Sequence, residues 1–135
     1  MNVFKEIREL ELPKDEYVVV GSSVLVVLGI IDSTEDVDIT VSEEIFDSLR
    51  SAGWQTGDGV NNPSLQQGLY DISTGFGKWK LADLQEDSAW IAGVPFMSLE
   101  KLLEWKKQKN REKDRRHIKL IERYLAELQP ADSRQ

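Results

Sequence analysis

Residues 17–41, which read YVVVGSSVLVVLGIIDSTEDVDITV, decide the fold. Residues 17–20 form an apolar, β-branched run, which is typical of a buried strand. The Gly-Ser-Ser sequence at residues 21–23 is expected to turn the chain. Residues 24–28 then favour a helix that a serine caps and Gly29 ends. The stretch therefore predicts a strand, a sharp turn and a short helix.

A second strand is expected at residues 36–41, where polar and apolar side chains alternate. Side chains two residues apart share one face of a strand and lie about 6.6 Å apart along it, so Asp36 and Asp38 point the same way. Two close carboxylates repel unless a cation or water lies between them. Mg²⁺ fits because it prefers carboxylate oxygens together with substrate phosphates. The alternative is a half-solvated strand with an acidic outer face.

The turn before the helix adds a second feature. A helix N-terminus presents free N–H groups and partial positive charge, which suit a phosphate. Gly21 would let the backbone approach that phosphate closely, and Ser22 and Ser23 supply hydroxyl groups. Taken alone, the same residues also describe an ordinary strand-to-helix turn. Together with an acidic pair that begins 15 residues after Gly21, they predict a site for a nucleoside triphosphate and its metal ion.

The 135-residue chain has the length of one domain, which is expected to cover residues 1–128. The polar stretch 129–135, which contains Pro130, is expected to be a flexible tail. The sequence has no cysteine, which excludes disulfides and thiolate metal sites. Its charged first residues do not resemble a signal peptide, and no run is long enough for a membrane span. A cytoplasmic location is the expectation.

Charge is unevenly distributed along the chain, whose net charge is −7. Residues 1–105 carry 7 basic and 19 acidic side chains, whereas residues 106–116 carry 7 basic and 2 acidic ones. The acidic part argues against extended nucleic-acid binding. The basic segment could hold phosphates or a partner protein, or it could be a solvated helix face.

The remaining segments are expected to mix helices and strands. Helices are expected at residues 3–10, after Ser42, after Ser98 and at 111–128; strands are expected at 69–74 and on either side of Gly93; residues 75–88 are expected to be irregular.

The order Gly-Ser, helix, Asp-x-Asp strand in residues 21–41 resembles the nucleotidyltransferase superfamily related to DNA polymerase β. The likeness is to small bacterial members, the minimal nucleotidyltransferases and the aminoglycoside or lincosamide adenylyltransferases. Residues 93–118, GVPFMSLEKLLEWKKQKNREKDRRHI, are similar to the C-terminal part of such proteins. The matching residues there are Gly93, Leu99, Leu102, Leu103, Lys106, Arg111, Lys113 and Asp114. The resemblance implies the nucleotidyltransferase fold, an α+β domain with a mixed, mostly antiparallel sheet flanked by helices.

The resemblance also implies an activity, the transfer of a nucleoside monophosphate from a nucleoside triphosphate to an acceptor hydroxyl. Asp36 and Asp38 would hold one or two Mg²⁺ ions, and Asp71 would be a third carboxylate that completes the metal site and acts as the base. Asp58, in a stretch typical of a turn, is the second candidate for that role. A solvated strand position is the alternative for Asp71. The turn at residues 21–23 would bind the nucleotide phosphates.

Two lysines of the basic segment are candidates for nucleotide binding. Lys106 and Lys113 are seven residues apart on an expected helix, so they are predicted to share one face and to neutralise charge on the leaving pyrophosphate. A solvated helix face is the alternative. Trp105 could stack on a base, although a place in the core is its more ordinary role.

Two positions depart from the family pattern. Ile30 and Ile31 stand where the family often has a basic residue, which could weaken triphosphate binding. His117 stands where the family often has aspartate, and a lone histidine on a helix is usually a surface residue. These departures keep a second class of function open, a catalytically idle member that binds a nucleotide or a partner protein, as in toxin–antitoxin pairs. The sequence leaves open the preferred base, the acceptor (a small molecule, an RNA end or a protein) and whether the chain forms a homodimer.

Overall fold

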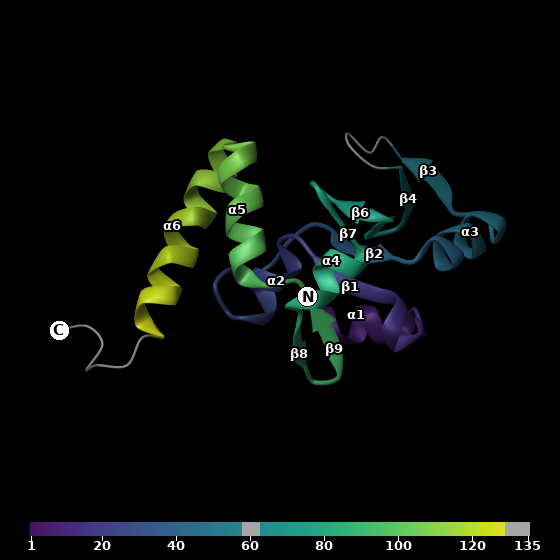
Figure 1. The fold of residues 1–135 in the computed structure, drawn as a ribbon, viewed down its shortest axis with the longest axis horizontal. Coiled ribbons are helices and arrows are strands. Elements are labelled where there is room, and N and C mark those ends of the chain that lie inside the picture. The colour runs from purple at the N-terminus through teal and green to yellow at the C-terminus, as the bar shows by residue number, and fades with distance from the viewer. Residues whose placement is uncertain (58–62, 129–135) are drawn as a thin grey trace. The chain divides into compact units, whose positions relative to one another are not determined.

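The computed structural model describes residues 1–57 and 63–128 (Figure 1). The chain divides into two compact units, Met1–Ser98 and Leu99–Gln135. The interpretation of residues 1–128 as one domain stays a prediction, because compact units occur within domains as well as between them. The expected tail at residues 129–135 lies outside the described residues. Over the described ranges, no helix has the length and apolar character needed to cross a membrane.

A seven-stranded mixed sheet forms the centre of the first unit, with the strand order β3-β4-β5-β2-β1-β9-β8 (Figure 1). Its strands are β1 (Tyr17–Val20), β2 (Val37–Val41), β3 (Gln55–Gly57), β4 (Ser64–Gln67), β5 (Tyr70–Ser73), β8 (Ala89–Ile91) and β9 (Val94–Phe96). The pairs β1–β9 and β2–β5 are parallel, and the other described pairs are antiparallel. The predicted α+β class with a mostly antiparallel sheet is therefore confirmed.

Helices flank this sheet. They are α1 (Val3–Glu9), α2 (Ser23–Val27), α3 (Glu43–Ser51) and α4 (Leu81–Glu86), with a 3₁₀ turn at Lys14–Glu16. Ser42 caps α3 as expected, because its side chain accepts a hydrogen bond from the backbone N–H of Ile45. The expected serine cap of α2 is wrong: the Ser22 side chain makes no capping hydrogen bond. The neighbouring Ser23 hydroxyl instead donates to the carbonyl oxygen of Asp36 at 3.4 Å.

Residues 75–88 are regular rather than irregular. They form a two-stranded hairpin, β6 (Gly75–Phe76) with β7 (Trp79–Lys80), and then α4. The backbone N–H of Lys80 donates to Asp83, which stabilises the start of α4. Leu84 is fully buried and anchors the helix to the core. The expectation failed because strands of two residues are too short to show an alternating pattern.

The central strands are buried, and this fixes which face carries the aspartates. Val37, Ile39 and Val41 of β2 have no solvent exposure, so Asp38 between them points to the opposite face. Asp36 differs from the expectation, because β2 begins at Val37 and Asp36 lies just before it in an exposed position. The two aspartates therefore do not occupy equivalent strand positions.

The second unit is a helical hairpin in which α5 (Leu99–Lys109) packs against α6 (Glu112–Glu127). The break between them falls at Asn110, whose φ of 50° lies in the left-handed region that asparagine tolerates. The expectation that Lys106 and Lys113 share one helix face is wrong, because the chain changes direction between them and they belong to different helices.

Candidate active site

The Asp38 carboxylate lies against the backbone of Gly21, at the end of β1. Val20, the last residue of β1, pairs with Asp38 of β2. Gly21 follows with a φ of 73°, a conformation that side chains disfavour. A Cβ atom at Gly21 would lie 2.7 Å from Oδ2 of Asp38. Only glycine therefore satisfies both the turn and the close approach of this carboxylate.

Asp38 and Asp71 are neighbours in the sheet. The parallel register of β2 and β5 pairs Asp38 with Asp71. Adjacent strands lie about 4.8 Å apart, and paired residues point to the same face. The next pair along, Ile39 with Ile72, is fully buried, which places both aspartates on the opposite face. The structure thus brings together two predicted site residues that lie 33 positions apart in the sequence.

The charge of Asp36 also affects the Asp71 carboxylate. Burial raises the pKa of Asp71, and the negative charge of Asp36 raises it further. The polar side chains of Gln66 and Ser64 on β4 lower the pKa of Asp71. The Ser64 hydroxyl is buried and makes no hydrogen bond in the described part of the chain. A raised pKa makes Asp71 a stronger proton acceptor than an ordinary aspartate.

The other predicted nucleotide-site residues of the first unit are less closely grouped. Ser22 stands at the start of α2, directly after Gly21. Ser23 is buried, and its hydroxyl bonds to the loop before β2, so it helps to fix Asp36. Asp58, the second candidate for the base, lies outside the described residues.

The carboxylates suit a divalent cation in their chemistry, because Mg²⁺ takes one or two carboxylates together with substrate phosphates. In residues 1–57 and 63–128, however, no three His, Cys, Asp or Glu side chains are arranged to hold a metal ion. The residues that fit such an ion are the neighbouring pair Asp38 and Asp71. Asp36 is near enough to affect Asp71 but does not complete a group of three.

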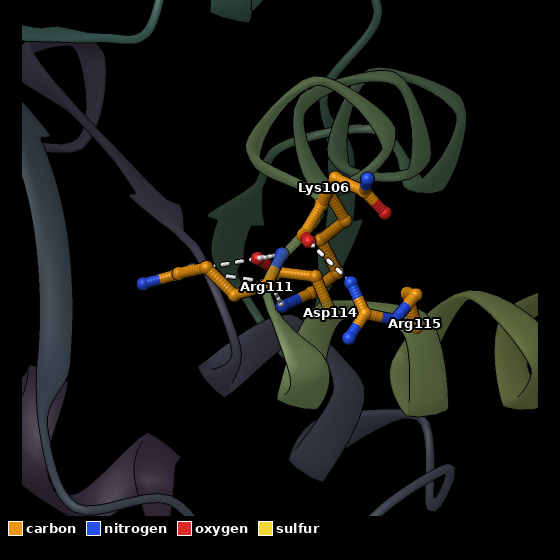
Figure 2. Close-up of polar contacts among 5 residues, drawn as sticks. Lys106, Arg111, Asp114 and Arg115 are labelled. Atoms are coloured by element: carbon orange, nitrogen blue, oxygen red, sulfur yellow. Dashed lines mark hydrogen bonds and ion pairs between the residues drawn. The ribbon is translucent and has the colours of Figure 1, made fainter.

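Lys106 and Asp114 form a buried ion pair in the helical hairpin (Figure 2). Both side chains have no solvent exposure, and Nζ of Lys106 lies 3.3 Å from Oδ1 of Asp114. Arg111 adds two side-chain hydrogen bonds to the same carboxylate, from Nε at 2.6 Å and from Nη2 at 3.1 Å. Burial alone would raise the pKa of Asp114, but the Arg111 hydrogen bonds and the Lys106 charge lower it to about 2. Burial lowers the pKa of Lys106, against the attraction of Asp114.

Trp105 and His117, whose roles the sequence left open, lie near this ion pair. The Trp105 ring is partly buried, and the charged groups of Lys106, Lys109 and Arg111 lie 5.3–5.7 Å from its centroid. His117 is partly buried rather than a surface residue, and its Nδ1 is buried without a hydrogen-bond partner among the described residues. Burial lowers the pKa of His117 to about 4, and the charge of Lys106 contributes to the shift. Lys113 is exposed.

Sequence reasoning missed Gln66 and Ser64, which lie beside Asp71. Gln66 pairs directly with Asp71 across β4 and β5. The period-two pattern of residues 64–67 opposite residues 70–73 was the signal that could have found them. The Lys106–Asp114 contact was also missed, because an eight-residue separation brings two side chains together only when a helix break lies between them.

Comparison with known proteins establishes the fold. No protein-family model matches the sequence, and no curated protein is significantly similar to it. The structure has the nucleotidyltransferase fold. It is similar to the crystal structure of the aminoglycoside adenylyltransferase ANT(2″)-Ia in complex with adenylyl-2″-tobramycin, with a TM-score of 0.56 and 16% sequence identity. The match covers 91% of this chain and 85% of that chain.

Replacing Gly21 by alanine tests the contact with Asp38. Gly29→Ala is the matched control, since Gly29 has nearly the same φ of 75° but nothing within 4 Å of its added Cβ. Both variants lose about 1–2 kcal/mol for the left-handed conformation. We expect only Gly21→Ala to lose more than this in urea unfolding, because its Cβ displaces the Asp38 carboxylate. Equal losses in the two variants would contradict the contact.

Removing one partner of the buried ion pair tests the helical hairpin. Asp114→Ala leaves the Lys106 charge buried without its carboxylate, and we expect a loss of about 3–5 kcal/mol in unfolding free energy. The double variant Lys106→Met/Asp114→Leu removes both charges and should recover most of that loss. Chemical denaturation of the three proteins measures the difference. A double variant as unstable as Asp114→Ala would show that charge burial is not the cause.

An NMR titration of His117 tests the burial of its ring. The signals can be assigned because His117 is the single histidine of the chain. We expect a midpoint near pH 4, since its pKa is lowered from 6.5 to about 4. The unfolded chain takes up this proton at higher pH than the folded one, so the stability that neutral His117 contributes is complete above pH 6.5 and is lost as the pH falls toward 4. Lys106→Met should raise the midpoint. A midpoint of 6.5 in the unaltered chain would mean that the ring is solvated.

Proposed function

We propose that this chain is a metal-dependent nucleotidyltransferase, which moves a nucleoside monophosphate from a nucleoside triphosphate to an acceptor hydroxyl. The observation that carries the proposal is the pairing of Asp38 with Asp71 beside Gly21. Two carboxylates at neighbouring strand positions repel each other, and the first is held against a turn that has no room for a side chain. Carboxylates kept together in this way are typical of sites that bind a cation with an anionic substrate.

The residues have separate parts in the reaction. Asp38, with Asp36 from the preceding loop, would hold Mg²⁺ against the triphosphate, and Asp71 would complete that site. The ion, when bound, offsets the phosphate charge and polarises the α-phosphate. Asp71 accepts the proton of the acceptor hydroxyl, for which its raised pKa is an advantage. The acceptor oxygen bonds to the α-phosphorus, the bond from that phosphorus to the bridging oxygen breaks, and pyrophosphate leaves with the electron pair.

The nucleotide phosphates would meet the turn at Gly21 and Ser22. Gly21 is buried beside the Asp38 carboxylate, whereas Ser22 is partly exposed and its hydroxyl does not cap α2. Of the two predicted lysines, both in the helical hairpin, Lys113 is exposed and stays a candidate for binding phosphate. Lys106 is buried, and its ammonium group bonds to Asp114.

The acceptor belongs to a class that carries a hydroxyl group. ANT(2″)-Ia is bound to adenylylated tobramycin in its crystal structure, so an aminoglycoside is one class to consider by analogy of fold. An RNA end and a protein hydroxyl are the others. The overall acidity of the chain, with a net charge of −7, favours a cationic acceptor over a polyanion.

A second candidate function is binding without catalysis. It is favoured by the lack of three acids arranged for a metal among the described residues, and by Ile30 and Ile31 at a position where a cation would help to hold phosphate. In that case the chain would bind a nucleotide or a partner protein, and the acids would not act on a metal.

Calorimetric titration with ATP, GTP, CTP and UTP, with and without Mg²⁺, separates the two functions. We expect Mg²⁺-dependent binding of at least one nucleotide, and its loss in Asp36→Asn/Asp38→Asn. The control is Asp32→Asn/Glu35→Gln, which makes the same change of net charge in the loop before β2 and should bind normally. Binding that ignores Mg²⁺, or no binding, would favour the second function instead.

A further inference from the structure

A pocket outside the candidate active site lies at the opposite end of β1 from the Gly21 turn. It has a volume of about 310 Å³ and lies between the end of α1 and the tip of the β8–β9 hairpin. Tyr17, the first residue of β1, lines it, about 13 Å along the strand from Gly21. Tyr17 pairs with Val41, which shares its sheet face with Ile39, so Tyr17 also points away from the face that carries Asp38. The pocket is therefore separate from the acidic pair.

Two left-handed residues shape the wall of this pocket. Glu11, just after α1, and Ala92, in the turn between β8 and β9, both have a φ of 51°. Glycine or asparagine is the ordinary residue at such positions, because other side chains disfavour this conformation. Nη2 of Arg8 donates a hydrogen bond of 3.1 Å to the carbonyl oxygen of Ala92 and so ties α1 to the hairpin. Strained residues of this kind are concentrated at binding sites.

Two cations line the pocket in a part of the chain that is otherwise acidic. Residues 1–105 carry 19 acidic and only 7 basic side chains, yet Arg8 and Lys14 both lie here, against a single acid, Glu11. The bond from Arg8 to Ala92 uses one of the five N–H groups of its guanidinium. Lys14 is exposed and forms no ion pair within the described residues. Two cations against one acid give the lining a net positive charge, which favours an anion.

Tyr17 adds a neutral donor to this lining, and three aliphatic side chains add an apolar wall. Tyr17 is 5% exposed, and its hydroxyl has no hydrogen-bond partner among the described residues. Burial raises the pKa of Tyr17, against the effect of the Arg8 charge, so the phenol keeps its proton at neutral pH. The aliphatic side chains are those of Ile7, Leu12 and Val94. A dianion such as phosphate would leave this wall in contact with water, and Glu11 would repel it more strongly than a monoanion.

We propose that this pocket binds a small monocarboxylate with an apolar body. The carboxylate lies between the Arg8 guanidinium and the Lys14 ammonium, and the Tyr17 hydroxyl donates a hydrogen bond to it. The apolar body lies against the aliphatic wall. The volume is at the lower end of the range for pockets that hold small molecules, about 300–1,000 Å³, so the ligand is small. The proposal does not rest on the nucleotidyltransferase activity, because the pocket shares no residue with that site.

Phenylacetate is the probe, titrated into the full ¹⁵N-labelled chain and followed by NMR. We expect the amide signals of Gly93 and Val94 to shift and to reach saturation below roughly 10 mM. Phenylacetamide, which is neutral, and phenethylamine, which is a cation, should bind at least roughly tenfold more weakly, since hydrogen bonds to an ionised carboxylate are the stronger ones. Lys14→Gln should weaken phenylacetate binding roughly tenfold, and Tyr17→Phe, which keeps the buried ring, roughly two- to tenfold.

The matched control is Lys5→Gln, which makes the same change of charge at an exposed lysine of α1 outside the pocket and should bind phenylacetate as the unaltered chain does. Amide spectra that match the unaltered chain away from the pocket would show that the variants are folded. The absence of saturable shifts at Gly93 and Val94 would overturn the site, and so would equal losses in Lys5→Gln and Lys14→Gln. Equal binding of phenylacetamide, or tighter binding of inorganic phosphate, would overturn the proposed class of ligand.

Discussion

The parallel register of β2 with β5 is the constraint on which the rest of this site depends. It sets Asp38 beside Asp71, and a shift of one residue would send one of these carboxylates into the core. The buried neighbours Val37 and Ile39 of Asp38, and Ile72 of Asp71, prevent that shift, because they would have to leave the core at the same time. The apolar packing of the sheet therefore offsets the repulsion between the two carboxylates. Gly21 leaves room for the Asp38 carboxylate to lie against the turn.

The helical hairpin depends on a different balance. Desolvation offsets much of the attraction between Lys106 and Asp114, so their ion pair adds little to stability. It nevertheless restricts the pairing of α5 with α6 to the arrangement that keeps both charges matched. Arg111 strengthens this restriction at the first turn of α6, where its backbone N–H and its guanidinium both bond to Asp114. Burial, and then the charge of Lys106, make the protonated form of His117 unfavourable and lower its pKa.

The sequence was informative where a local pattern controls the structure, and uninformative where contacts are distant. The β-branched run at 17–20, the glycine turn and the alternating strand were predicted because each has its own signal. The hairpin and helix at 75–88 were missed because their elements are so short. The start of the last helix near residue 111 was predicted, but the change of direction at Asn110, which puts Lys106 and Lys113 on different helices, was not. That Asp38 lies next to Asp71 follows from the strand order, which no local pattern specifies, and the roles assigned to these residues and to Asp36 stay predictions.

Asp71 lies on β5, which follows β1 to β4 in the sequence, and this order matters while the chain is being synthesised. The Gly21 turn and Asp38 lie on adjacent antiparallel strands that can pair early, whereas β5 reaches β2 only after β3 and β4 have been made. Distant pairings of this kind form slowly. A nascent chain that has not yet emerged beyond residue 73 therefore holds one half of the acidic pair without the other, and the carboxylates first repel each other when most of the sheet is present to resist them.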